Sequence, residues 1–331
     1  SCSYLQAMES RSLSGELWEY IKNGQNESHL ENINQILNNA RSQTVDDEWP
    51  SAVTVNTIYQ DSHDFIWIGT QDGLNRYDGY HLKIFKNDPF NKTTISSNDI
   101  KCILEDKNGI MYFGSNGGWL SVYNKFTDVF TNYVSGLSAN TISNNIVKDI
   151  IELNDNELLL ATSNGVNVFN KVSKKFIQVF YPQIEGDISF TKIFKDKNGN
   201  IWIGSESNNI FEYVHQSKKL INYGLPQKFE EHDKNNKEIS TRRNCIYSIT
   251  QHQNNLIFGT DGVLLYFDLI KKEYINIFSF DESNRYNNRI KCFATSADSS
   301  TLWFGTWGGL VRFNLNNQSY QIERKNETSI N

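Results

Sequence analysis

Proline, methionine and long apolar runs are all scarce in this chain. Its 331 residues include 4 Pro and 2 Met. No run of about 18 apolar residues occurs, so the sequence holds no segment that could cross a bilayer as a helix. Positive charge is not in surplus either, because 32 Lys and Arg stand against 38 Asp and Glu, a net charge of −6. This balance argues against a general binder of nucleic acids or anionic membranes.

Motifs of metal binding and catalysis are also missing. The 4 Cys and 6 His are not spaced as zinc ligands. Neither a Gly-x-Ser-x-Gly elbow nor a phosphate-binding glycine loop occurs. The sequence therefore predicts no metal, no cofactor and no catalytic residue.

A six-fold internal repeat is the dominant pattern that the sequence does contain. Each copy has an apolar segment with a small residue near its end, as in Phe65-Ile66-Trp67-Ile68-Gly69-Thr70. The small residue recurs every 43 to 55 residues, at Gly69, Gly114, Ala161, Gly204, Gly259 and Gly305. A period of about 40 to 50 residues built from short strands is the signature of propeller blades.

Four strands can be read in each repeat. An apolar segment such as Ile100–Leu104 leads through the turn Asn108-Gly109 to the segment with the small residue, and two further strands follow. Asn-Gly pairs accept the positive φ angles that tight hairpins need. The near-continuous apolar run of the second segment fits a strand covered on both faces. The sequence therefore predicts an all-β fold, a β-propeller of four-stranded antiparallel blades. Six blades are visible, and a seven-blade ring stays open.

The N-terminal end does not follow the repeat. Residues 1–48 form a separate segment, in which Ser28–Ala40 is predicted to be a helix. One face of this helix would carry Leu30, Ile33, Ile36 and Leu37, and Ser28 and Glu31 have the spacing of a capping box. The first seven residues resemble the tail of a secretory signal peptide cleaved after Ala7.

The propeller is assigned to residues 49–331 and is expected to be incomplete at its C-terminus. Residues 325–331 echo residues 91–98, which precede an inner strand. The chain therefore stops where another blade should begin, and we expect it to be a fragment of a longer protein.

Two of the four cysteines, Cys102 and Cys292, occupy one register of the repeat, aligned with Thr57 and Ser248. Equivalent positions in non-adjacent blades do not easily approach to the Cα separation of about 5.5 Å that a disulfide needs. We therefore expect these cysteines to be small buried side chains between blades.

The segment from Asp61 to Gly79 closely resembles the two-component regulator propeller repeat. After Trp67-Ile68-Gly69-Thr70 it continues as Gln71-Asp72-Gly73-Leu74-Asn75-Arg76-Tyr77-Asp78-Gly79. The resemblance covers about residues 50–324 and is strong in units one, four and six. Two units depart from it: Ala161 replaces the small glycine in unit three, and the turn of unit four has no glycine, reading Glu206-Ser207-Asn208-Asn209.

This resemblance implies the N-terminal periplasmic sensor region of a hybrid two-component system histidine kinase. Such proteins join a glycan-sensing region to a histidine kinase, a receiver and a DNA-binding output module in one chain. Members usually carry two seven-blade propellers and an immunoglobulin-like domain before the membrane segment. The resemblance thus implies that the second propeller and the immunoglobulin-like domain are partners in the parent chain. It also implies that the kinase and the nucleic-acid contacts lie in parts absent here, and it leaves a homodimer open.

One face of the predicted ring gathers polar and aromatic side chains. On this face lie the turn between the second and third strands of each blade and the link to the next blade. An aromatic ring beside amides and carboxylates suits a sugar, whose C–H face stacks while its hydroxyls form hydrogen bonds. The alternative is that the two tryptophans in these turns pack across the mouth of the ring or against a second propeller. The candidate ligand-binding residues are Gln71, Asp72, Asn116, Trp119, Glu206, Asp261 and Trp307.

The longest link, residues 228–243, reaches the same face and adds Arg242 and Arg243 to the candidate set. A run of mixed charge is usually a solvated loop, and that alternative stays open here. Adjacent guanidinium groups nevertheless match the carboxylates or sulfates of an acidic glycan.

The sequence thus predicts a periplasmic sensor domain that binds a glycan or oligosaccharide and performs no chemistry on it. Two rival functions stay open. A structural or protein-interaction propeller would use the same face to dock a partner. A propeller lyase or glycosidase is the other rival, because its catalytic groups would be scattered over several blades without any detectable spacing.

Overall fold

The computed structural model describes residues 54–134, 141–179, 188–207, 209–224, 245–279, 289–296, 298–306 and 309–323. In these ranges the chain forms six four-stranded antiparallel sheets and no helix, so none of the described residues belongs to a helix that could cross a membrane. The predicted β-propeller is confirmed. The expected helix over Ser28–Ala40 and the expected cleavage after Ala7 lie outside the described residues, as do residues 325–331.

Each sheet is one blade, built from four strands in sequence order. Blade 1 holds β1 (Val55–Gln60), β2 (Ile66–Thr70), β3 (Leu74–Tyr77) and β4 (Leu82–Phe85). Blade 2 holds β5 (Ile100–Glu105), β6 (Met111–Ser115), β7 (Leu120–Asn124) and β8 (Val129–Tyr133). Blade 3 holds β9 (Val147–Asn154), β10 (Glu157–Thr162), β11 (Gly165–Asn170) and β12 (Lys175–Gln178). Blade 4 holds β13 (Phe190–Lys195), β14 (Ile201–Ser205), β15 (Ile210–Val214) and β16 (Lys219–Tyr223). Blade 5 holds β17 (Ser248–His252), β18 (Asn255–Gly259), β19 (Val263–Asp268) and β20 (Glu273–Ser279). Blade 6 holds β21 (Cys292–Thr295), β22 (Thr301–Thr306), β23 (Gly309–Asn314) and β24 (Tyr320–Glu323).

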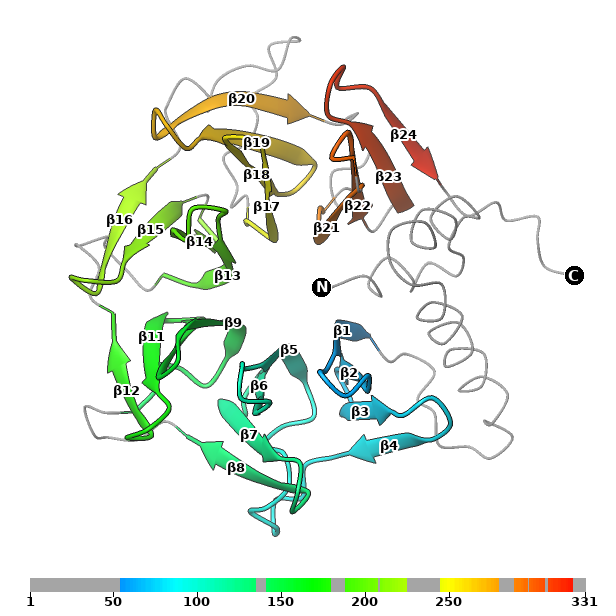
Figure 1. The fold of residues 1–331 in the computed structure, drawn as a ribbon, viewed down its shortest axis with the longest axis vertical. Helices are drawn as coiled ribbons and strands as arrows, with labels where there is room; N and C mark the ends of the chain where they lie inside the picture. The colour runs from blue at the N-terminus through cyan, green and yellow to red at the C-terminus, as the bar shows by residue number, and fades with distance from the viewer. Residues whose placement is uncertain are drawn as a thin grey trace, which may run out of the picture.

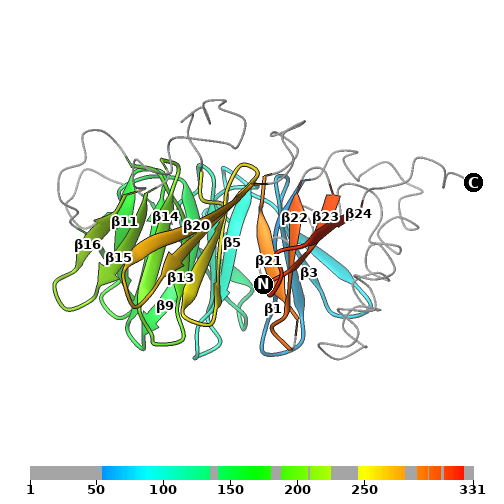
Figure 2. The same cartoon turned by 90° about the horizontal axis from the view of Figure 1, so that it is seen from above.

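The six blades are arranged radially around a central axis. Figure 1 looks down this axis and shows the first strand of every blade, from β1 to β21, facing the centre, while the fourth strands form the outer rim. Figure 2 shows the same ring from its side, with the strands running across its thickness. Because the strands alternate in direction, the turns between second and third strands lie at the same end as the links between blades.

The second strand of each blade is buried on both faces, and in blades 2 to 5 both faces pack against a neighbouring blade. Every residue of β2 and of β14 is buried. Trp67 packs toward blade 2, where its ring centroid lies 5.3 Å from that of Phe113. Ile66 and Ile68 belong to a separate cluster on the other face of blade 1. Successive side chains of a strand point to opposite faces, so the near-continuous apolar run follows from this double burial, as predicted.

The small glycine of the second strand marks the closest approach between blades. A Cβ atom at Gly69 would lie 2.6 Å from Thr57 Cγ2 of its own blade and 2.8 Å from Ile100 Cγ2 of the next. At Gly204 it would lie 2.6 Å from Ile246 Cγ2, again in the inner strand region of the following blade. Glycine is therefore required by space. In blade 3 Ala161 takes this place, fully buried in the cluster between blades 3 and 4.

The residue after the glycine closes the turn to the third strand. It is Thr or Ser in all six blades, and its hydroxyl donates to a carbonyl oxygen across the turn. Thr70 Oγ1 lies 2.9 Å from the carbonyl oxygen of Gly73, and Thr306 Oγ1 lies 2.8 Å from that of Gly309. In blade 4, where the turn has no glycine, Ser205 donates to the carbonyl of Asn209 at 3.0 Å and accepts from its N–H at 3.2 Å.

A buried aspartate organises the hairpin between the first and second strands. In blade 4, Asp196 accepts hydrogen bonds from the N–H groups of Asn198 and Asn200, both at 2.9 Å. Its other oxygen accepts from Trp202 Nε1 at 3.0 Å. In blade 1, Asp61 accepts the corresponding hydrogen bonds from the backbone N–H groups of His63 and Phe65 and from Trp67 Nε1. Gly199 follows with φ of +86°, as the Asn-Gly signal predicted.

The predicted register of the cysteines is confirmed. Cys102 lies opposite Gly114 and Cys292 opposite Gly305, the place that Ser248 has opposite Gly259. Cys102, Cys245 and Cys292 are buried. They are therefore packing residues of the blade interfaces.

Substituting Gly204 by Ala is expected to destabilise the propeller. The new methyl group would overlap Ile246 of the next blade, and overpacking of this kind costs about 1 to 3 kcal/mol. The matched control is Gly224→Ala, whose Cβ would meet Asn209 Oδ1 at an ordinary 3.6 Å and should change stability by less than about 1 kcal/mol. Urea denaturation of both variants measures this, and equal effects would contradict the role of Gly204.

The Asp196 carboxylate is expected to make stability depend on acid pH. Burial acts to raise the pKa of Asp196, but the hydrogen bonds from Trp202 and Asn200 outweigh it and hold the pKa below its ordinary value. A lowered folded pKa contributes stability above the unfolded value of about 3.9, and that stability is lost as pH falls through the folded pKa.

Asp196→Asn cannot accept the hydrogen bonds from the backbone and from Trp202 at the same time. It should therefore lower the free energy of unfolding by about 1 to 3 kcal/mol at neutral pH. The difference from the wild type should shrink as the pH falls below about 4. Urea denaturation across that range is the measurement, and a difference that stays constant with pH would contradict the ionised state of Asp196.

Candidate ligand-binding site

The first strand of each blade turns one side chain toward the central axis. In blades 1 to 4 this happens where the pairing with the second strand is irregular. The pairing of the first and second strands shifts register around Asn56, Lys101, Lys148 and Thr191 in blades 1 to 4. In blades 5 and 6, Tyr247 and Lys291 hold the same place, just before the residue opposite the glycine. A bulge leaves one residue outside the ladder and re-aims its side chain. The repeat thereby supplies one such side chain from every blade.

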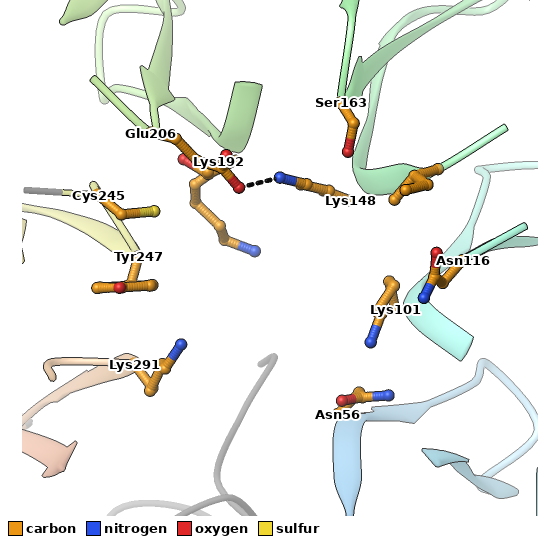
Figure 3. A pocket seen from close by; sticks show the side chains of 12 residues that line it. Asn56, Lys101, Asn116, Lys148, Ser163, Lys192, Glu206, Cys245, Tyr247 and Lys291 are labelled. Carbon is orange, nitrogen blue, oxygen red and sulfur yellow. Dashed lines mark hydrogen bonds and ion pairs between the residues drawn. The ribbon is translucent and has the colours of Figure 1, made fainter. Parts of the chain in front are cut away.

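These six residues line a cavity of about 500 Å³ at the centre of the ring. Figure 3 shows Asn56, Lys101, Lys148, Tyr247 and Lys291 around this opening. Asn116, Ser163 and Glu206, each directly after a second strand, also line it. The cavity therefore lies at the end of the ring that carries the turns between second and third strands. The remaining described lining residues are Ile146, Lys192 and Cys245.

Four lysine ammonium groups dominate the lining. Figure 3 shows Lys101, Lys148, Lys192 and Lys291 pointing into the opening from four different blades. Glu206 is the one carboxylate among the described lining residues, and it pairs with Lys148. The cavity is thus locally cationic in a protein whose net charge is −6.

Carboxylates behind the lining hold two of these lysines. Lys101 Nζ lies 2.8 Å from Asp99 Oδ1, and Lys192 Nζ lies 2.9 Å from Asp149 Oδ2. Both pairs are less than a third exposed. The carboxylates fix the positions of the ammonium groups at the wall, so the lysines form a preset arrangement around the opening.

Lys291 has a different environment. Its Nζ lies 3.8 Å from the centroid of the Tyr247 ring, a cation–π contact. Burial lowers the pKa of Lys291 to about 8, and the positive charges of Arg289 and Lys101 act in the same direction. The Cys245 thiol and Asp261 oppose this shift. The charge of Lys291 is therefore held at some cost in free energy.

A small network fixes the aromatic wall of the cavity. Tyr247 donates its hydroxyl to Asp261 Oδ1 at 3.2 Å, and Arg289 Nε donates to the same oxygen at 2.8 Å. Asp261 and Arg289 also form an isolated β-bridge. The Tyr247 ring is thereby held beside Lys291. Burial raises the pKa of the Cys245 thiol to about 12, so this neighbour stays protonated at neutral pH.

The structure brings some of the predicted site residues together and separates others. Asn116 and Glu206 line the cavity, and Asp261 lies one layer behind it through Tyr247. Gln71 and Asp72 lie in the turn of blade 1 and are not lining residues; Asp72 pairs with Lys86 at 3.0 Å.

Of the two tryptophans in the candidate set, only Trp119 lies among the described residues. Trp119 is half-buried with φ of +62° and packs against the hydrophobic cluster between blades 2 and 3. Its ring therefore contacts the interface between blades 2 and 3, and its role in ligand binding stays a prediction. Trp307, Arg242 and Arg243 lie outside the described residues, so they stay predictions.

Sequence reasoning missed the inner-strand residues that line most of the cavity. Asn56, Lys101, Thr191, Tyr247 and Lys291 were not in the candidate set. A signal for them existed, because Lys101 and Lys291 occur in matching Ile-Lys-Cys segments, each a polar residue between two buried ones. Without the ring, however, a polar residue in a strand looks like any solvent-facing position.

Within the described ranges, no group of three His, Cys, Asp or Glu side chains could hold a metal ion. The donors that converge on the cavity are ammonium groups, an amide, hydroxyls and one carboxylate. Such a set suits hydrogen bonds to a polar or anionic ligand and not the coordination of a cation.

Three segments of the chain match the sequence profile of a known family described as two component regulator propeller. They are residues 50–72, 94–117 and 184–207. Each segment contains the whole first strand, the following turn and the second strand of blade 1, 2 or 4. A further stretch of 46 residues, 14% of the chain, is 46% identical to part of Histidine kinase P4 of Formosa agariphila and spans 3% of that protein.

Solved structures share the fold. The extracellular domain of the putative hybrid two component system BT4673 from B. thetaiotaomicron matches 85% of this chain, with a TM-score of 0.63 and 21% identity. That of the putative hybrid two component system BT3049 from the same organism matches 80%, with a TM-score of 0.61 and 19% identity. The chain covers 34% of each of these two structures.

The described part of the chain is therefore a six-bladed β-propeller with a cation-lined cavity at one end of its central axis. Three of its blades match the two component regulator propeller family, the family that the sequence resembles.

The ammonium group of Lys291 is expected to titrate near pH 8, because burial disfavours its charged form. Reductive ¹³C-methylation of the lysines followed by NMR should show one resonance that moves near pH 8. This resonance should be missing from the spectrum of Lys291→Met. It should be present in the control variant Lys175→Met, which removes a lysine from an outer strand. A spectrum in which no lysine resonance titrates there would contradict the buried position of Lys291.

Proposed function

We propose that this chain is the sensor domain of a hybrid two-component signalling protein, placed in the periplasm, where it binds a glycan or oligosaccharide. The signal passes to a histidine kinase in another part of the parent protein. The family of the repeats and the likeness in fold to extracellular domains of putative hybrid two component systems support this placement.

The observation that carries the proposal is the cavity shared by six blades. Its volume of about 500 Å³ is in the range of small-molecule sites and matches a short saccharide. The wall offers an aromatic ring at Tyr247 together with the amide of Asn116 and the hydroxyl of Ser163. An aromatic face with convergent polar groups suits a sugar, whose surface is part C–H and part hydroxyl.

A ligand in this cavity would contact all six blades at once. It would therefore favour the arrangement of blades that gives the best contacts, and only such a difference in affinity between arrangements can transmit a signal. In the parent protein the change would be read by the remainder of the sensor, which we propose to be a second propeller and an immunoglobulin-like domain, or by a second copy. Binding and release suffice for this role, and we propose no chemistry on the ligand.

A protein-interaction propeller is the second candidate, and one observation favours it. Four turns between third and fourth strands carry exposed apolar tips: Tyr80, Phe126, Val172 and Ile270, from 75% to 100% exposed. Because strand direction alternates, these tips lie at the end of the ring opposite the cavity. A partner docked there would leave the cavity free, so the two functions are separable by experiment.

Isothermal titration of the chain with neutral, uronic and sulfated oligosaccharides tests the proposed function. Saturable binding to at least one class is expected. Asn116→Ala should weaken it about fivefold, the loss expected for one polar contact. The matched control is Gln71→Ala, the equivalent turn position of blade 1, which lies outside the lining and should leave affinity unchanged.

Silence across the panel from folded protein would contradict saccharide sensing and leave the interaction propeller as the better reading. Chromatography of each saccharide after incubation completes the test. New products would contradict the proposal that the domain performs no chemistry.

A further inference from the structure

The lysines of the cavity are arranged for a particular kind of ligand. Lys101, Lys148 and Lys291 hold the same position in the inner strands of blades 2, 3 and 6, and Lys192 lies next to that position in blade 4. Their ammonium groups meet around one opening (Figure 3). Clefts lined by one sign of charge focus the field and concentrate ions of the other sign. The lysines thus give the mouth a positive lining, whereas the chain as a whole carries a negative net charge.

Other donors around the opening are already engaged within the protein. The side-chain amide of Asn56 donates to Asp99 Oδ1 and to the carbonyl oxygen of Ile100, both at 2.9 Å. The hydroxyl of Thr191 donates to the carbonyl oxygen of Ile246 at 2.5 Å. An ammonium group has three N–H donors, so a lysine that holds one carboxylate, as Lys101 does, can also donate into the cavity. Recognition at this mouth therefore falls largely to the lysines.

One contact in the cavity already shows how an acidic group is held there. The Glu206 carboxylate projects from the turn of blade 4, half exposed, and pairs with Lys148 of blade 3. Lys148 also donates to Ser189 Oγ at 2.7 Å. A ligand carboxylate or sulfate would meet this ammonium group in the same way, competing with Glu206 across the mouth.

We propose that the mouth of the central channel is an anion site, in which Lys101, Lys148, Lys192 and Lys291 bind a ligand that carries carboxylate or sulfate groups. Two sources share this chemistry: an acidic saccharide and a free inorganic dianion. The saccharide source rests on the proposed sensing function, whereas the anion site stands on the lysines alone. Pairs of ammonium and oxyanion groups are among the stronger hydrogen bonds of proteins.

The buried environment of the Lys291 ammonium group supports the proposed anion site. Its charge is disfavoured by burial, and an anion beside it would restore the charged form. Binding near pH 8 should therefore take up a proton. Among the described residues, the charged and titratable groups that act on Lys291 include Tyr247, Cys245, Asp261, Arg289 and Lys101.

The test titrates the chain by calorimetry with a sulfated disaccharide, its unsulfated neutral counterpart and sodium sulfate, at low and at moderate ionic strength. The sulfated sugar should bind more tightly than the neutral one, and its affinity should fall as salt screens the lysines. Lys101→Met/Lys291→Met should weaken it by about tenfold or more for each lysine. The matched control removes the same charge from the outer strands, Lys175→Met/Lys219→Met, and should bind like the wild type.

A second variant keeps the test sharp if the double methionine variant does not fold. Glu206→Gln removes the carboxylate that competes for Lys148 and is a near-isosteric change at a half-exposed position. This variant should bind the sulfated sugar several-fold more tightly. Titration near pH 8 in two buffers of different ionisation enthalpy should show proton uptake that is lost in Lys291→Met.

The outcomes separate this inference from the proposed function. Equal binding of the sulfated and neutral sugars, unchanged in the lysine and Glu206 variants, would overturn the anion site and leave saccharide sensing intact. Binding of sulfate alone, weakened in the lysine variant, would support the anion site and contradict saccharide sensing. Absence of any binding by folded protein would overturn both.

Discussion

The close approach between a blade and its successor is the constraint on which the rest of this structure depends. Gly69, Gly114, Gly204 and Gly259 each leave room for an aliphatic side chain from the following blade, at distances that no Cβ atom would allow. Large side chains of the second strands then fill the space further from the axis, as Trp67 does between blades 1 and 2. Small residues near the centre and large ones outside give each blade a wedge shape, and wedges form a ring.

The same constraint produces the cavity. Where the inner strand passes the glycine, its pairing slips by one residue in blades 1 to 4, and the extra side chain turns toward the axis. The packing positions on either side are restricted by the neighbouring blades. The slipped position is less restricted, because its side chain faces the channel, although Asn56 and Thr191 still donate to carbonyl oxygens of the following blade. The repeat can therefore vary its channel residue without disturbing the ring, and here it carries Asn, Lys, Lys, Thr, Tyr and Lys.

This separation of packing from lining has a consequence for sensing. A scaffold whose packing residues are distinct from its channel residues can carry channel linings of different chemistry without a change in fold. In this chain the lining is cationic although the protein as a whole is acidic. Glu206 and Lys148 come from different blades, so an anion that exchanges with their pair acts on the contact between blades 3 and 4.

The sequence by itself determined the blade, and the tertiary structure decided the site. The spacing of Gly69, Gly114 and their equivalents, the Asn-Gly turns and the double-faced apolar strands are local patterns, and each was visible in the chain. So was the register of Cys102 and Cys292. The cavity was not visible in the sequence. Lys148 lies 47 residues after Lys101, and Lys291 lies 143 residues after Lys148, so these side chains meet only when the ring brings their strands to one axis. For the same reason the sequence did not show that Trp119, which breaks the register of the core tryptophans, packs against the cluster between blades 2 and 3.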